Sequence, residues 1–214
     1  MKTYKIRAKI AEAIAIEQNT HLLANSLAKV AALRTGIVLS SRQREDGVAF
    51  IKAYVEYVPM LLDQLDAESK KLKIEQSINP LISQVEYYFF LEEDAIPDRL
   101  GLLGLMDDGY IANNVVQKLS EQYQLNGSGA LVTHHIAAFN PIMRNLIGEP
   151  QATILDGYVQ EILNGQEVRV LLEQLQTIAD KAPSFTMEHY NHPIWENATT
   201  DEIVNARIGS LGFA

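Results

Sequence analysis

Carboxylates gather in one short stretch of the chain, residues 92–108, which reads EEDAIPDRLGLLGLMDD and which we call the acidic corner. Pro97 disfavours the α conformation at Ile96, so a helix is expected to stop there and the chain to turn. Carboxylates that converge across such a turn could hold a divalent cation, because Mg²⁺, Mn²⁺ and Ca²⁺ take oxygen ligands. The candidate metal ligands are Asp94, Asp98, Asp107 and Asp108.

A structural role for the same aspartates is the favoured interpretation. Asp98 can accept hydrogen bonds from backbone amides in the turn, and Asp107 can cap the helix that follows. Asp108 would then lie in the first turn of that helix, where the positive end of the helix dipole stabilises a carboxylate. The spacing is not that of an EF-hand, and no histidine lies nearby in the sequence. Apart from the divalent cation of the alternative interpretation, no cofactor is expected.

The corner also carries a recognisable order of residues. An aromatic helix end at 87–90 is followed by an Asp-x-Ile-Pro-Asp turn at 94–98 and by a Gly-Leu-Met-Asp-Asp helix start at 104–108. Over residues 87–119 this order and spacing resemble the YkvA-like family, also called domain of unknown function 1232. Arg99, Gly101 and Gly109 depart from the residues usual in that family. The resemblance implies a helix–turn–helix corner and brings no reaction with it, because no reaction is established for the family.

Other residues capable of chemistry form no catalytic pattern. His134 and His135 are adjacent, so on a helix they point about 100° apart and cannot chelate one ion together. His189 and His192 have helical spacing, but Pro193 argues against a regular helix there. The chain has no cysteine, which excludes disulfides, thiolate zinc sites and cysteine nucleophiles. Because phosphate-binding and nucleophile-elbow motifs are also missing, the sequence favours a non-enzymatic protein.

The composition is that of a globular protein with an acidic surface. The 214 residues are 47% apolar and 21% charged, with a net charge of −9. Such a surface repels phosphate backbones, so nucleic acid is not an expected partner. The first residues carry lysines but also Glu12 and Glu17, which is typical of a helix and not of a signal peptide. No window is long and apolar enough to cross a membrane, and a cytoplasmic location is expected.

Apolar residues recur at helical spacing almost throughout, and no sustained alternation predicts a strand. The fold class is therefore all-α, an irregular helical bundle of about seven to nine helices. Residues 1–182 form the helical domain that contains the corner, and 183–214 form a partly irregular C-terminal tail with a short helix. Proline at position 59 predicts a kink or break, and Asn79-Pro80 predicts a helix start. The expected helices cover about 6–34, 40–65, 80–91, 107–123, 130–146, 151–164, 166–182 and 201–209.

The aromatic run Tyr87 to Phe90 would cover every side of a helix, so at least one ring should be exposed or face a second chain. The first hypothesis is accordingly a helical interaction or scaffold protein. It would use the first helix and the helix at 80–91 to self-associate or to bind a protein partner. One alternative is a metal-dependent hydrolase built on the acidic corner. Another is a peripheral membrane protein that binds the membrane surface through its lysine-bearing first helix.

Overall fold

The fold is all-α, as predicted, and was obtained as a computed structural model that describes residues 3–91, 95–125 and 134–179. No strand occurs within these ranges. One 3-10 helix, η1, lies at the acidic corner. The helices are α1 Thr3–Thr20, α2 Leu22–Thr35, α3 Ser41–Leu72, α4 Glu75–Tyr88, η1 Asp98–Leu103, α5 Met106–Leu125, α6 His134–Ile147, α7 Gln151–Leu163 and α8 Gln166–Ala179.

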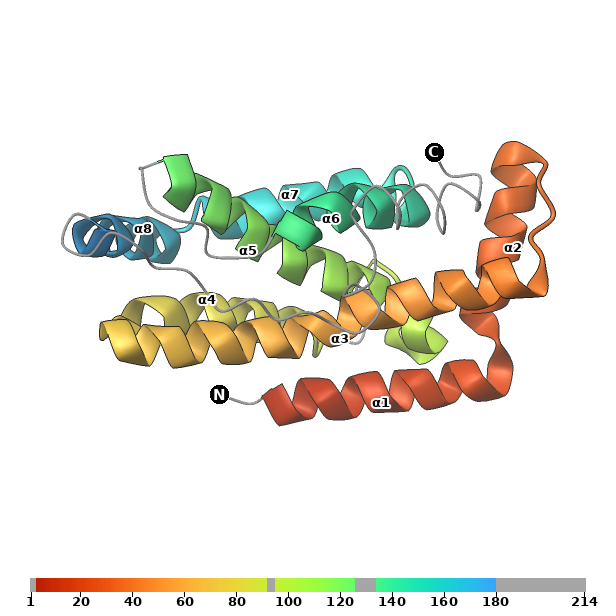
Figure 1. The fold of residues 1–214 in the computed structure, drawn as a ribbon, viewed down its shortest axis with the longest axis horizontal. Helices are drawn as coiled ribbons and strands as arrows, with labels where there is room; N and C mark the ends of the chain where they lie inside the picture. Colours follow the sequence, from red (N-terminus) through yellow and green to blue (C-terminus); the bar gives the residue numbers. More distant parts are fainter. Residues whose placement is uncertain (1–2, 92–94, 126–133, 180–214) are drawn as a thin grey trace.

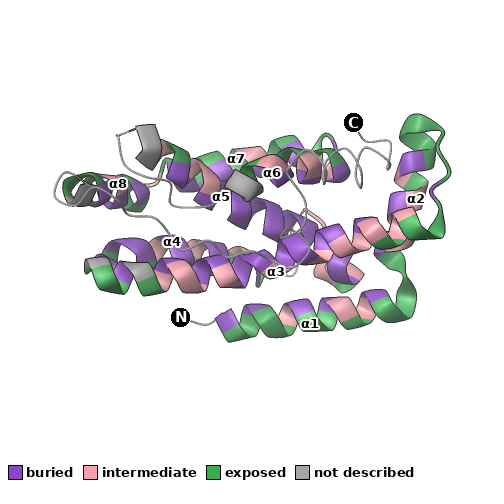
Figure 2. Cartoon of the chain, viewed as in Figure 1, coloured by how far each residue is buried: buried purple, intermediate pink, exposed green. Residues whose placement is uncertain are grey.

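The long helix α3 runs through the middle of the molecule and is contacted by α1, α2, α4 and α5 (Figure 1). Its start follows from local sequence: the Ser40 side chain accepts a hydrogen bond from the Gln43 backbone, and the Gln43 side chain accepts one from the Ser40 backbone. Such a capping box contributes about 1 kcal/mol. Helices α5 to α8 lie above α3 in the view of Figure 1, and α1 lies below it. Buried residues are concentrated where α3, α4 and α5 meet, whereas the outer side of α1 is exposed (Figure 2).

A chain of polar side chains crosses this apolar core and links three helices. The Tyr54 hydroxyl donates to the Asn140 side-chain oxygen, and the Asn113 side chain donates to the Tyr54 backbone oxygen over 3.1 Å. Asn140 in turn donates to Gln117. Burial raises the pKa of Tyr54 well above its usual value, so its hydroxyl stays protonated and available as a donor. These bonds satisfy polar groups that would be costly to bury alone.

The predicted continuous helix over 6–34 is wrong, because the chain breaks at His21. His21 adopts a left-handed conformation with φ 52° between α1 and α2. The Glu17 carboxylate accepts hydrogen bonds from the backbone N–H groups of Leu23 (2.7 Å) and Ala24 (3.0 Å). Glu17 therefore caps α2 from the preceding helix, and this holds the break in place. Gly36 ends α2 as predicted, with its N–H donating to the Ala32 carbonyl.

The helix start expected at Asn79-Pro80 is also wrong, since α4 begins at Glu75 and Pro80 lies inside it. Likewise, α3 continues through Pro59 without a break. A proline inside a helix costs about 3 kcal/mol. Each fully buried Leu, Ile or Val contributes about 1.5–3 kcal/mol, and α4 buries Ile78, Leu81, Ile82 and Val85. Core packing therefore outweighs the local cost. The expected tail, 183–214, lies outside the described residues.

Candidate functional site

At the acidic corner, η1 packs closely on α1. Gly101 in η1 has φ 66° and ψ −132°, a conformation that favours glycine. A Cβ atom there would lie 2.8 Å from Ile16 Cγ2, and one on Gly104 would lie 2.5 Å from the Pro97 carbonyl oxygen. Gly101 is thus required by the contact between η1 and α1.

Asp107 holds the two halves of the corner together through backbone contacts. Its Oδ2 accepts a hydrogen bond from the Ile96 N–H over 2.8 Å, and its Oδ1 accepts one from the Asp108 N–H over 3.2 Å. Asp107 and Asp108 both lie in the first turn of α5, and each is 1% exposed. These contacts fit a structural role, because a buried carboxylate is stabilised by N–H donors and by the positive helix end.

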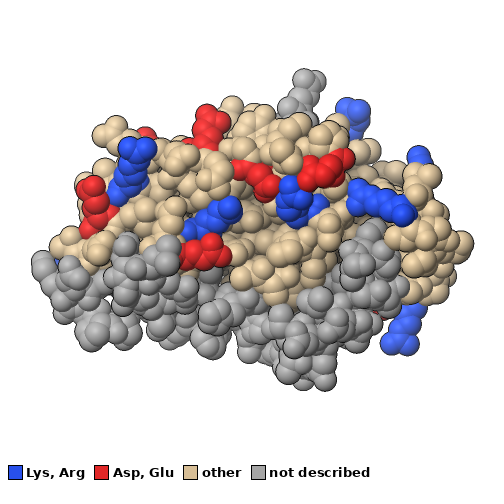
Figure 3. All heavy atoms as spheres, turned by 90° about the horizontal axis from the view of Figure 1, so that it is seen from above, with Lys and Arg blue, Asp and Glu red and all other residues tan. Residues whose placement is uncertain are grey.

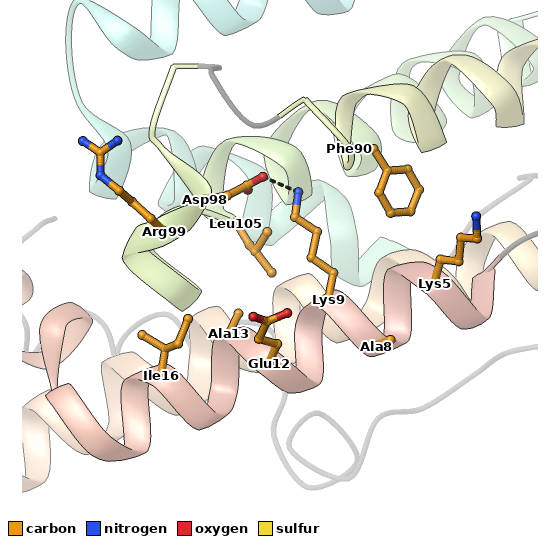
Figure 4. Close-up of a pocket in the computed structure, with 10 residues that line it drawn as sticks. All are labelled: Lys5, Ala8, Lys9, Glu12, Ala13, Ile16, Phe90, Asp98, Arg99 and Leu105. Atoms are coloured by element: carbon orange, nitrogen blue, oxygen red, sulfur yellow. Dashed lines mark ion pairs between the residues drawn. The ribbon is translucent and has the colours of Figure 1, made fainter.

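The two remaining candidate ligands that the structure describes, Asp98 and Asp108, face a cation on α1. The Lys9 ammonium lies 2.6 Å from Asp98 Oδ2 and 3.7 Å from Asp108 Oδ2. It also donates a hydrogen bond to the Phe89 carbonyl oxygen at the end of α4. Figure 4 shows Lys9 reaching from α1 to Asp98, with Phe90 beside it. We call Lys9, Asp98 and Asp108 the lysine cluster; it joins α1, η1 and α5 by charge.

The lysine cluster bears directly on the metal hypothesis. The Lys9 ammonium lies between Asp98 and Asp108, where that hypothesis requires a metal ion. Asp94, the fourth candidate ligand, lies outside the described residues. Over the ranges that the structure describes, no group of three or more His, Asp or Glu residues is placed to hold a metal ion. The divalent-cation site therefore stays a prediction without geometric support.

The histidine pairs add no second site within the described parts of the chain. His134 and His135 stand at the start of α6, but their side chains are not described. His189 and His192 lie outside the described residues.

Sequence reasoning missed Lys9, although the sequence contains a signal for it. Lys9 lies one helical turn from Ile6 and Ala13, which are 0% and 4% exposed, so it belongs to the buried face of α1. A lysine on a buried face needs a carboxylate partner, because an unpaired buried charge is strongly unfavourable. The signal does not say which carboxylate, since Asp98 is far away in the chain.

A cavity of about 630 Å³ opens beside the lysine cluster. Helix α1 contributes Lys5, Lys9 and Glu12, and the corner contributes Phe90, Asp98 and Arg99. Its charges are mixed, and Figure 4 shows Lys5 and Arg99 at opposite ends of it. The Lys9 ammonium is directed at the Asp98 and Phe89 oxygens, so this group is committed to holding the fold together.

The opposite side of the corner is aromatic. Tyr88 lies between Tyr87 and Tyr158, with ring centroids 6.3 Å and 5.6 Å away. Two hollows flank Tyr88, one of about 350 Å³ lined by Leu91, Ile154 and Tyr158 and one of about 330 Å³ lined by Tyr87 and Glu161. We call this surface the aromatic groove; its residues are Tyr87, Tyr88, Leu91, Ile154 and Tyr158.

The groove exposes large apolar side chains. Tyr87 is 64% exposed, Ile154 50% and Tyr158 40%. The prediction that a ring of the aromatic run is exposed is therefore confirmed, and Phe90 is exposed as well, on the side facing the cavity. Burial, followed by the nearby Tyr158 and Glu161, raises the pKa of Tyr88 to about 12. Its hydroxyl is a neutral donor at ordinary pH.

Comparisons with known proteins give no relative. No family model matches the chain, so the inferred membership of the YkvA-like family is wrong, and the resemblance over residues 87–119 is not a sign of that family. Searches of curated proteins and of solved structures return no match either. The described helices also include none that is long and apolar enough to cross a membrane.

Proposed function

We propose that the protein is a non-enzymatic helical interaction protein that binds another polypeptide through the aromatic groove. The observation that carries the proposal is the group of exposed apolar side chains around Tyr88, which lies beside two hollows of side-chain size. Contiguous apolar surface of this kind is typical of protein-binding sites. Tyrosine suits them in particular, because it offers a large apolar area and a polar end.

Three observations support binding over a purely structural role for these tyrosines. None of the hydroxyls of Tyr87, Tyr88 and Tyr158 hydrogen-bonds to another residue in the described part of the chain, so they are available to a partner. The Tyr88–Tyr158 contact ties α4 to α7, which gives the surface a fixed shape. Helix α7 is also joined to α5 and α6, since Asp156 accepts hydrogen bonds from Tyr110 (2.7 Å) and from Arg144 (3.0 Å).

The first helix, by contrast, contributes little to this proposal. It buries Ile6, Ile10 and Ala13 within the chain itself. Its apolar face is therefore occupied, and α4 together with α7 carries the interaction.

Site-specific photo-crosslinking in the native host tests the proposal. A benzoylphenylalanine in place of Tyr158 should form a covalent adduct with another polypeptide, and Ile154→Asp should abolish that adduct. Both positions are exposed, so the fold should tolerate the changes to within about 0.5 kcal/mol. Val170 on α8 is a matched control, because it is also 40% exposed but lines neither hollow. Equal amounts of adduct from positions 158 and 170, or no adduct from position 158, would contradict the proposal.

A further inference from the structure

The charged residues that the structure describes in the lining of the two hollows are all acidic. Among the described residues, neither hollow is lined by a lysine or an arginine, whereas Glu161 lines one and Asp107 and Asp108 line the other. The two helices that build the groove, α4 and α7, contain no lysine or arginine at all. They carry four carboxylates, those of Glu75, Glu86, Asp156 and Glu161. The groove is therefore an apolar surface in a negative field.

Not all of these carboxylates are available to a partner. Asp156 is bound to Arg144, and Asp107 is bound to backbone N–H groups. Glu161 is different, because it is exposed and forms no ion pair with any described residue. It lines the hollow beside Tyr87 and Tyr88, and it also contributes to the raised pKa of Tyr88. Within the described part of the chain, Glu161 is thus an unpaired negative charge at the edge of an apolar hollow.

The tyrosine rings, like Glu161, favour a positively charged group on the partner. The face of an aromatic ring attracts ammonium and guanidinium groups, by about 0.5–1 kcal/mol at exposed sites. Tyr87 and Tyr158 are exposed beside Glu161, so a cation over one of these rings would also face a carboxylate. A surface that combines apolar hollows, ring faces and an unpaired carboxylate is complementary to a segment with apolar anchors flanked by lysine or arginine.

We infer that the occupant of the aromatic groove is a basic amphipathic helix of another protein, an inference that rests on the function proposed above. Apolar residues spaced three or four positions apart would enter the two hollows on either side of Tyr88. Lysine or arginine residues beside them would meet Glu161 and the tyrosine rings. This commits the groove to one class of partner, a cationic helical segment.

A second copy of this chain fits the groove less well. In a two-fold symmetric dimer the same surface is used on both copies, so one acidic, lysine-free groove would face another. Each copy also carries a net charge of −9. An anionic membrane surface is disfavoured for the same reason. On the face seen from above, Figure 3 shows acidic and basic side chains interspersed, with no broad basic area among the described atoms.

Designed peptides test the inference directly on the whole protein. The probe is a fluorescein-labelled amphipathic helix of about 18 residues, with leucine and phenylalanine at helical spacing and lysine on the flanks. Its twin keeps the apolar residues and replaces every lysine with glutamate. Fluorescence anisotropy should detect binding of the basic peptide only, and the affinity should fall as salt is raised because exposed charges are screened.

Substitutions in the groove localise the binding. Ile154→Asp should lower the affinity for the basic peptide by about tenfold or more, and Glu161→Lys should lower it by about threefold to tenfold. The matched controls Val170→Asp and Glu12→Lys introduce the same charge changes away from the groove and should leave the affinity unchanged. Circular dichroism of all four variants verifies that each retains its helical fold.

The outcomes separate the inference from the proposed function. If both peptides bind equally and Ile154→Asp weakens both, the groove binds helices but the cationic class is wrong. If the basic peptide does not bind, and light scattering shows a dimer that Ile154→Asp dissociates, the occupant is a second copy. Flotation with phosphatidylcholine vesicles that depends on Ile154 would make it a lipid surface. No binding in any assay, together with no crosslink from position 158, would overturn the inference and the proposed function alike.

Discussion

The acidic corner has two sides, and its aspartates have different neighbours on each. On the side of α1, Asp98 and Asp108 face the Lys9 ammonium, and charge holds the elements together. On the side of α7, Asp108 also lines a hollow whose other residues are mainly apolar and aromatic. The charged side is therefore part of the interior of the fold, whereas on the aromatic side large apolar side chains are exposed among the described residues. This difference is the reason why we place the proposed binding site at the tyrosines and not at the aspartates.

The largest expected effect comes from removing the cation of the lysine cluster. Lys9→Met leaves the carboxylates of Asp98 and Asp108 without their ammonium, and their side chains are only 16% and 1% exposed. Removing one partner of a buried ion pair lowers the free energy of unfolding by about 3–5 kcal/mol. Denaturation with urea measures the loss. Lys5→Met, at an exposed position on the same helix, should stay within about 0.5 kcal/mol of wild type.

A double variant distinguishes charge from packing in this result. If the loss comes from uncompensated carboxylates, Lys9→Met combined with Asp108→Asn should be more stable than Lys9→Met alone. A loss in Lys9→Met of less than about 1 kcal/mol would show that the lysine cluster does not stabilise the corner. The charged side of the corner would then not differ from the aromatic side in stabilising the fold.

The next effect concerns the turn that positions both sides. Gly101→Ala should lower the free energy of unfolding by about 2–4 kcal/mol, which combines backbone strain with a steric clash. The residue has φ 66°, and its new Cβ would meet Ile16 Cγ2 at 2.8 Å. Adding Ile16→Ala to Gly101→Ala should recover the steric part and leave the backbone part. A Gly101→Ala variant as stable as wild type, measured by urea denaturation, would contradict the close packing of η1 on α1.

The parts of the fold that the sequence predicts well are those determined by residues close together in the chain. The cap at Ser40, the stop at Gly36 and the end of α7 near Asn164 all depend on neighbouring residues, and each is predicted close to its observed position. The aromatic exposure also follows from the spacing of residues on one helix.

The features that sequence reasoning misses depend on contacts between distant segments. The break at His21 depends on Glu17 reaching the next helix, and the continuity of α4 through Pro80 depends on burial in the core. At the site, Lys9 meets Asp98, and Tyr88 meets Tyr158, only after the helices have packed. Among the candidate metal ligands, Asp98 and Asp108 face a lysine that no local pattern identifies. The backbone contacts of Asp107, by contrast, agree with the structural role that its position before a helix suggests.

The smallest expected effect is a pH dependence that arises in the aromatic groove. The pKa of Tyr88 is raised from 10.0 to about 12, so between these values the unfolded chain loses a proton that the folded chain keeps. Stability from this group is complete below pH 10 and is lost as the pH rises toward 12. The decline is less than about 1.4 kcal/mol per pH unit, because solvent screens a partly exposed ring.

The difference in free energy of unfolding between wild type and Tyr88→Phe, followed by denaturation from pH 9 to pH 12, isolates this effect. As the pH rises, wild type should steadily lose stability relative to Tyr88→Phe. Ile162→Val, which changes packing in the same hollow without removing a hydroxyl, should differ from wild type by a constant amount. A constant difference for Tyr88→Phe as well would mean that the groove does not hold this hydroxyl in its neutral form.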